Sequence, residues 1–267
     1  MLSNRLLIGQ YYPTGSPLHA LDARSKIIAS LLYMITLFVV SGWPAYFALT
    51  LVFALTLAIS RIPFPALLRG LKLIFIFVVL TMILNAFFTP GTALWSWRSF
   101  TLTKEGLNHG AAMGLRLLLL VSFASLLTLI TEPLALTDGL ESLLKPLRRL
   151  GVPAHEIAMM MSIALRFIPT ILEEFDRIVL AQRARGADVA KGNLMKRIAA
   201  MMPLLVPLFV AAFRRADELA QAMEAKCYCG GEGRSRWRRS QWHMKDTLYI
   251  GIFIALLLGA VAARILF

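Results

Sequence analysis

The chain has 267 residues, of which 58% are hydrophobic and 16% charged, and its formal net charge is +13. Soluble domains are roughly 45–50% apolar and about 25% charged, so this composition excludes an ordinary soluble domain and predicts an integral membrane protein. In such a protein the default place for surplus Lys and Arg is the cytoplasmic flank of the spans, so the charge alone does not indicate a nucleic-acid partner.

The first segment, residues 1–26, is rich in turn-forming residues and lacks the uninterrupted apolar core of a secretory signal. We expect it to be an ordered cytoplasmic lead-in. Beyond it, five segments are apolar enough for membrane helices, which need roughly 20 residues each. They are residues 27–42, 44–60, 71–89, 110–131 and 246–266. The first two are short and joined by Ser-Gly-Trp-Pro, which predicts a tight hairpin or one tilted, partly re-entrant helix.

The basic residues are distributed unevenly between the connecting segments. With the N-terminus inside, the predicted cytoplasmic segments 1–26, 60–72 and 132–245 hold 24 of the 28 Lys and Arg residues. This asymmetry predicts a multi-pass membrane protein with its N-terminus inside and its C-terminus outside. Arg116 stands inside the fourth span. It either handles a substrate or ion or, as we favour, reaches a lipid headgroup or forms a structural pair.

Residues 132–245 contain no clean span but are too apolar for an ordinary cytosolic loop. Helices are predicted over 136–149, 154–185 and 194–226. The two long ones would each measure roughly 48 Å, and their apolar residues recur every three or four positions, which is typical of amphipathic helices. Residues 198–213 contain two prolines and have basic residues at both ends, which predicts a helix along the cytoplasmic interface rather than a sixth span.

We therefore expect an all-α integral membrane protein in three parts. Residues 1–131 hold the lead-in and four transmembrane helices, 132–245 form a cytoplasmic domain of one short and two long helices, and 246–267 form the final transmembrane helix. The Met-rich apolar stripes of the long helices indicate contact with another membrane protein, since Met repacks readily around a partner. The residues assigned to this contact are Ile157, Met161, Ile168, Ile171, Phe175, Met202, Leu205 and Phe209.

Both long helices end in the same way, on a small residue followed by a cation. The two ends are the tripeptides Ala184-Arg185-Gly186 and Ala225-Lys226-Cys227. A cation in the last turn is favoured by the helix dipole, and glycine accommodates a left-handed cap, so one such end needs no further explanation. The duplication predicts two plugs that fit acidic grooves on a partner that is itself a dimer or pseudo-dimer.

In its longer motifs the chain resembles the transmembrane T component of energy-coupling factor transporters, the vitamin and metal-ion importers of the ABC class. The resemblance covers essentially the whole chain. It is carried by YPTGSPLHALDARSKI with Asp22, Arg24 and Lys26, by RFIPTILEEFDRIVLAQRARGAD, and by RRADELAQAMEAKCYCGGEGRSRW. It implies that the two helix ends dock into grooves on two ATPase subunits. The second motif of the family centres on arginine. Here Lys226 keeps the charge but lacks arginine's planar fork of donors, and Cys227 replaces glycine.

The resemblance also implies a non-catalytic subunit that transmits ATPase closure to a separate small membrane subunit, which binds the substrate. ATP and Mg²⁺ would then be held by the partner ATPases, and this chain would carry no cofactor or metal. The absence of a G-x-x-x-x-G-K-[ST] loop, which cradles nucleotide phosphates, agrees with this expectation.

Two other classes of function stay open on the residues alone. A substrate-translocating carrier would need polar groups along its spans, where few stand out beyond Arg116 and Asn85. An integral membrane enzyme would need a cytoplasmic-face active site, although helical spacing favours a solvated or ion-paired face for the acidic residues involved. The residues that such an enzyme would use are His155, Arg166, Glu173 and Asp176.

Two further patterns have simple interpretations. Cys227 and Cys229 predict free cytosolic thiols, because no third and fourth ligands are spaced nearby for a metal. The run RSRWRRSQWHMK immediately precedes the last span, which predicts anchoring to lipid headgroups and not nucleic-acid binding.

Overall fold

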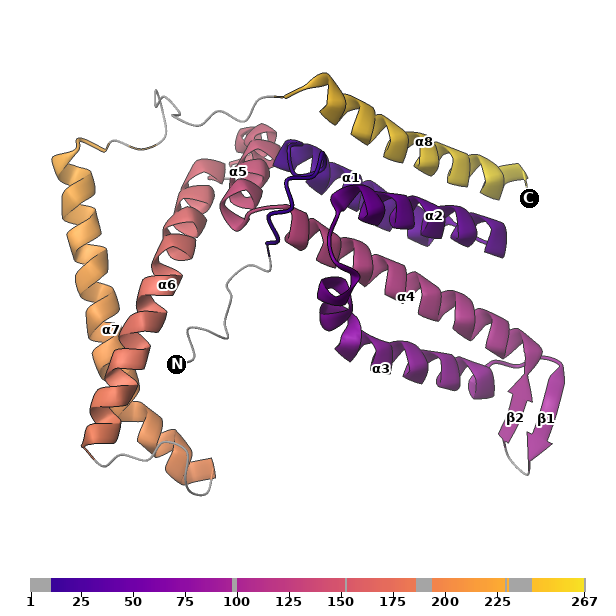
Figure 1. Ribbon diagram of the computed structural model, residues 1–267, viewed down its shortest axis with the longest axis horizontal. Helices are drawn as coiled ribbons and strands as arrows, with labels where there is room; N and C mark the ends of the chain where they lie inside the picture. Colours follow the sequence, from indigo (N-terminus) through magenta and orange to yellow (C-terminus); the bar gives the residue numbers. More distant parts are fainter. Residues whose placement is uncertain are drawn as a thin grey trace. The chain divides into compact units, whose positions relative to one another are not determined.

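The structure, a computed structural model, describes residues 11–97, 100–151, 153–185, 194–228, 230 and 242–266. In this part the chain is almost entirely α-helical, as predicted, with one two-stranded sheet (Figure 1). The described residues fall into two compact units. We call residues 11–142 with 242–266 the membrane unit, and residues 143–230 the long-helix unit.

The membrane unit holds most of the helices. These are α1 (Ala23–Val39), α2 (Trp43–Ser60), α3 (Phe64–Phe88), α4 (Lys104–Ile130), α5 (Pro133–Leu144) and α8 (Met244–Leu266). An antiparallel hairpin of β1 (Ala93–Trp97) and β2 (Phe100–Thr103), which the sequence analysis did not predict, connects α3 to α4. The long-helix unit contains a short 3₁₀ helix (Lys145–Leu150), α6 (Ala154–Ala184) and α7 (Leu194–Ala225).

Two membrane helices begin earlier than their apolar spans. Helix α3 starts at Phe64, whereas the predicted apolar span was 71–89. Pro65 lies in its first turn, where proline costs no hydrogen bond. Helix α4 starts at Lys104 because the Thr103 side chain caps it, accepting a bond from the Gly106 N–H at 3.2 Å. In both helices, additional helical turns therefore precede the predicted apolar span.

Among the described residues, five helices are long and apolar enough to cross a membrane, namely α2, α3, α4, α6 and α8. The number agrees with the prediction, but the membership differs: α1 is missing from this set and α6 is present. Helix α1 has 17 residues, or roughly 26 Å, which is shorter than the bilayer core. Helix α6 qualifies because its first half is apolar, although its second half is charged. Its assignment as a cytoplasmic coupling helix stays a prediction.

An aromatic cluster forms the core of the membrane unit. The Tyr33 ring of α1 stacks on Phe123 of α4 at 4.2 Å between centroids, and Phe253 of α8 meets both rings edge-on. The Tyr33 hydroxyl, fully buried, donates to the Leu49 carbonyl of α2 at 3.2 Å. Four helices are therefore joined at one point, which places α1 beside the helices of membrane-spanning length.

Helices α3 and α4 approach each other closely along a line of glycines on α4. A Cβ added at Gly106 would lie 2.5 Å from the Asn85 backbone oxygen, and one at Gly110 would lie 3.0 Å from the Met82 backbone oxygen. At Gly114 the nearest atom would be a Val78 methyl carbon at 3.1 Å. Small residues every fourth position let membrane helices pack backbone to backbone, and Figure 1 shows α3 and α4 side by side.

A buried polar cluster ties α8 to the start of α1. The fully buried Asp246 carboxylate accepts bonds from the Asp22 N–H, the Ser25 hydroxyl and the His243 N–H, all at 2.8 Å. A buried charge is tolerated when it is hydrogen-bonded in this way. The Asp22 side chain in turn caps α1 by accepting from the Arg24 N–H at 3.0 Å. The quoted N-terminal motif thus has an internal structural role.

Lys26 extends this cluster to the end of α4. Its Nζ donates to the His19 carbonyl at 3.1 Å and to the Ile130 carbonyl at 3.2 Å. Burial lowers the pKa of this ammonium to about 8, while the nearby carboxylates of Asp246 and Asp22 act in the opposite direction. In the described part of the lead-in segment, the Tyr12 N–H donates to the Leu129 carbonyl at 2.9 Å.

Helix α5 belongs mainly to the membrane unit. Its Gly139 packs against Ala23 of α1, where an added Cβ would lie 3.0 Å from the Ala23 Cβ. The compact membrane unit therefore extends to residue 142, beyond the domain boundary that we placed after residue 131. The functional division into 1–131, 132–245 and 246–267 stays a prediction.

Candidate functional site

The candidate site is the pair of long helices α6 and α7, which lie side by side (Figure 1). Glu174 of α6 and Arg215 of α7 form an ion pair at 3.8 Å, and about a third of each side chain is exposed. A pair this exposed contributes little to stability, and it marks a place where the two helices face each other. It agrees with the interpretation of the acidic residues of α6 as an ion-paired face.

Helix α6 ends at the first predicted docking motif. The Arg185 N–H donates to the Gln182 carbonyl at 3.1 Å and to Ala181 at 3.3 Å, and its backbone is already leaving the helical conformation. The side chains of Ala184 and Arg185 are both exposed. Gly186, the third residue of the motif, lies outside the described residues.

Helix α7 ends in a Schellman motif built on the second predicted docking residues. The Tyr228 N–H donates to the Met223 carbonyl at 3.0 Å, and the Cys227 N–H donates to Glu224 at 2.8 Å. These are the two bonds that define the motif, whose left-handed position usually holds glycine. Cys227 takes that position with φ of 55°. It therefore fills the backbone role of glycine and presents an exposed thiol.

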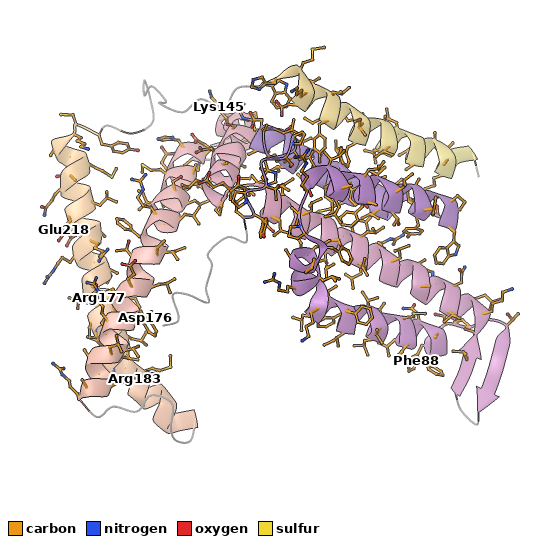
Figure 2. All side chains as sticks on the ribbon, in the orientation of Figure 1. Phe88, Lys145, Asp176, Arg177, Arg183 and Glu218 are labelled. Atoms are coloured by element: carbon orange, nitrogen blue, oxygen red, sulfur yellow. The ribbon has the colours of Figure 1, made fainter. Side chains whose placement is uncertain are left out.

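The cations at the two tips are open to partners. Ala225 and Lys226 are exposed, like Ala184 and Arg185 at the other tip. Among the described residues, neither Lys226 nor Arg185 has an ion-pair partner. Arg183, labelled in Figure 2, lies in the last turn of α6 close to Arg185. It is a further exposed cation that is not part of the motif.

The residues assigned to contact with another membrane protein divide into two groups. Ile157, Ile168, Ile171 and Phe175 of α6 are half-buried, whereas Met161 of α6 is exposed. The three assigned residues of α7 are exposed and belong to a wider surface that we call the α7 apolar face. It comprises Met202, Leu205, Val206, Phe209, Val210 and Phe213, exposed by 38–69%.

Sequence analysis missed half of the α7 apolar face. It followed one stripe, spaced by four and three residues, through Met202, Leu205 and Phe209. Val206, Val210 and Phe213 flank this stripe and widen it. Their apolar character was visible in the sequence, but a single stripe of that spacing leaves out positions one residue away. The half-buried stripe of α6 and the open face of α7 together make α7 the better candidate for an external contact.

The comparisons with known proteins cover nearly the whole chain. Residues 14–237 match the CbiQ family, described as cobalt transport protein. A protein of Acidaminococcus fermentans is 50% identical over 251 residues, which are 94% of each chain. Proteins of Ruminiclostridium cellulolyticum and Clostridium kluyveri are 48% and 47% identical over 262 and 259 residues, covering at least 95% of each chain. All three are named energy-coupling factor transporter transmembrane protein EcfT.

The chain belongs to the CbiQ/EcfT family. The resemblance drawn from the motifs is thereby confirmed, and so is the prediction of an all-α, multi-pass membrane protein. Membership in a family of transporter transmembrane proteins also favours a subunit of a larger transporter over an independent enzyme.

The enzyme alternative also fails on geometry. The residues that it would use are distributed along α6, and the rise of 1.5 Å per residue places His155 roughly 30 Å from Asp176. Arg166 and Glu173 are exposed, on the polar surface of the helix. Four groups so far apart do not converge on one substrate. In the described part of the chain no cluster of His, Cys, Asp and Glu is suited to a metal ion.

The carrier alternative depends on two polar residues inside the spans, Arg116 and Asn85. The Asn85 side chain has a structural role. The Asn85 amide nitrogen donates to the Thr81 carbonyl one turn earlier in α3, at 2.9 Å. Its amide group is therefore engaged within its own helix. Arg116 lies in a cavity of the membrane unit and is considered separately below.

Proposed function

We propose that this chain is the non-catalytic coupling subunit of an energy-coupling factor importer in a prokaryotic plasma membrane. Two ABC-type ATPase subunits would bind ATP and Mg²⁺ and hydrolyse the nucleotide. A separate small membrane-embedded subunit would bind the vitamin or metal ion. The N-terminus and the long helices would face the cytoplasm. The observation that carries this proposal is that α6 and α7 each end on an exposed cation that has no ion-pair partner among the described residues and is preceded by an exposed alanine.

Two features of these ends suit docking into a partner. A lone cation on a helix tip is attracted to an acidic groove, which orients the encounter and fixes its register. The small alanine before each cation lets the wall of a groove approach the helix closely. The two tips are not equivalent, because Arg185 can bind a carboxylate with two parallel bonds and Lys226 cannot. We therefore expect Arg185 to contribute more to ATPase binding.

The long helices suit the transmission of movement. At 31 and 32 residues they are each roughly 47 Å long, about three times an average helix. Displacement of a tip by closure of the ATPases would therefore move side chains far along the helix. The α7 apolar face would supply the surface through which that movement reaches the substrate-binding subunit, because a group of exposed apolar side chains on one helix face is typical of an interaction site.

The proposal is tested by co-purification of the tagged chain with its ATPases from the native membrane. Arg185→Glu reverses the charge of the first plug, and we expect at least a tenfold loss of bound ATPase because a like charge replaces an ion pair in the groove. Lys226→Glu is expected to cause a smaller loss. Arg183→Glu is the matched control, since it reverses an exposed cation on the same helix outside the motif.

The docking assignment is wrong if Arg185→Glu retains as much ATPase as Arg183→Glu. Equal membrane insertion and equal elution profiles of the variants show that the comparison reports docking and not folding. Recovery of the wild-type chain as an active protein without any ATPase would instead favour the enzyme alternative.

A further inference from the structure

Arg116 lies in the membrane unit and plays no part in the proposed coupling. It is in α4, and its guanidinium lies over the rings of Phe38 and Tyr46, 5.9 and 5.8 Å from their centroids. Its Nη2 donates to the Val40 carbonyl over a long distance of 3.4 Å, and its Nη1 reaches the Met113 sulfur at 4.0 Å. These contacts hold the guanidinium in place without neutralising it.

The guanidinium retains unused hydrogen-bonding capacity. Its Nε is buried and has no hydrogen-bond partner in the structure. Within the described part of the chain no carboxylate lies within ion-pair distance of Arg116. Arginine carries five N–H donors, and a buried donor left unpaired costs free energy. An intramembrane cation in this state indicates a ligand that supplies both negative charge and oxygen acceptors.

A cavity of about 520 Å³ adjoins this guanidinium. Two acceptors in its lining are already engaged: the Asn108 oxygen accepts from the Trp43 Nε1 at 2.6 Å, and the Glu105 carboxylate accepts from the Thr92 N–H at 2.7 Å. His109 lies at the exposed rim. Arg116 supplies the permanent positive charge of this lining, which an anion requires.

We propose that this cavity binds the phosphate of a phospholipid headgroup through Arg116. Phosphate matches the planar donor fork of arginine and supplies two or more acceptors with the required charge. The acyl chains have an apolar surface beside the cavity, because Leu31, Ile35 and Phe38 form one exposed face of α1 that ends at the guanidinium. Trp43 and Tyr46 at the cavity wall are the residue types that sit at headgroup level.

The test is native mass spectrometry of the delipidated full-length chain in detergent, titrated with phosphatidylglycerol. We expect one tightly bound lipid, and Arg116→Gln should weaken its binding roughly tenfold or more through loss of charge-assisted hydrogen bonds. Lys104→Gln is the matched control, because it removes an exposed cation at the first residue of α4, and it should leave binding unchanged. Diacylglycerol with the same acyl chains lacks the phosphate. The wild type and Arg116→Gln should therefore bind it equally.

Three outcomes overturn the proposal. Equal phosphatidylglycerol binding by the wild type and Arg116→Gln assigns Arg116 a purely structural role. Displacement of the lipid by millimolar inorganic phosphate makes this a site for the free ion.

If Arg116→Gln does not fold, photo-crosslinking of the wild-type protein decides the question. The probe is phosphatidylglycerol that carries a photoreactive group near the phosphate. Adducts are expected within residues 38–46 and 109–116, and adducts confined to other segments contradict the site.

Discussion

The membrane unit and the long-helix unit differ in what surrounds their polar and apolar groups. In the membrane unit, Asp246 and Lys26 are buried and hydrogen-bonded within the chain, and the α3–α4 contact is closed by glycines. In the long-helix unit, the Glu174–Arg215 pair is partly exposed, the tip cations have no partner among the described residues, and the α7 apolar face is open.

This difference separates two kinds of sequence constraint. Residues of the membrane unit are explained by neighbours in the same chain, so their substitution should lower the stability of the isolated protein. Residues at the tips and on the α7 apolar face have few neighbours in the chain, and surface substitutions of this kind usually change stability by about 0.5 kcal/mol or less. Their effects should be seen in assembly.

The largest effect on stability is expected at Asp246. Asp246→Leu removes the acceptor of two buried donors, from Asp22 and Ser25, and of the part-buried His243 N–H, and we expect a loss of about 3–5 kcal/mol. Thermal unfolding of the purified chain in detergent measures this loss. Asp246→Asn keeps one acceptor oxygen and should lose less. Leu248→Ala, on the exposed surface of the same helix, is the control, and an equal loss there would contradict a specific role for the cluster.

A graded effect is expected along the glycines of α4. Gly106→Ala should cost about 2–3 kcal/mol, because its Cβ would meet backbone oxygen at 2.5 Å, and Gly110→Ala should cost less. Gly114→Ala should cost least, since the Val78 side chain can yield. Gly251→Ala on α8 meets no atom within 4 Å and should be neutral or stabilising in the same thermal measurement. Equal losses at the three α4 positions would show that α3 and α4 separate easily.

The same contrast explains which parts of the structure the sequence predicted. Amphipathic spacing is a local signal, and it placed the ends of α6 and α7 within one residue. The Gly106-x₃-Gly110-x₃-Gly114 pattern was also visible, but its meaning depends on the close approach of α3, which is a tertiary fact. The burial of Lys26 against the Ile130 carbonyl depends likewise on a contact between segments 104 residues apart.

Other features lay beyond single-chain periodicity. Strands β1 and β2 are five and four residues long, too short to stand out between two long apolar spans. The sequence analysis counted α1 among the membrane-spanning helices and left out α6. Helix α1 is too short because it ends before Val40–Gly42, and α6 is included because its first half is apolar. The length and polarity of a segment can be read from the sequence. Whether the resulting helix packs within the membrane unit or against another protein cannot.

The smallest predicted effect lies at the tip of α7 and has the opposite sign. Cys227 holds a left-handed conformation, which costs an ordinary residue roughly 1–2 kcal/mol, whereas glycine adopts it freely but loses about 0.5–1 kcal/mol of chain entropy on ordering. Cys227→Gly should therefore stabilise the end of α7 by about 0.5–1 kcal/mol. The amides of Cys227 and Tyr228, which close the Schellman motif, report this change directly. Their hydrogen exchange should become roughly two- to fivefold slower.

Cys227→Ala separates the backbone effect from any effect of the thiol. It retains the Cβ at positive φ, so we expect exchange rates close to those of the wild type. If Cys227→Ala slowed exchange as much as Cys227→Gly, the thiol and not the backbone would be the source of strain. Because Lys226 immediately precedes this residue, a firmer cap should also hold the cation in a narrower range of orientations. The Cys227→Gly variant should then bind the ATPases at least as well as the wild type.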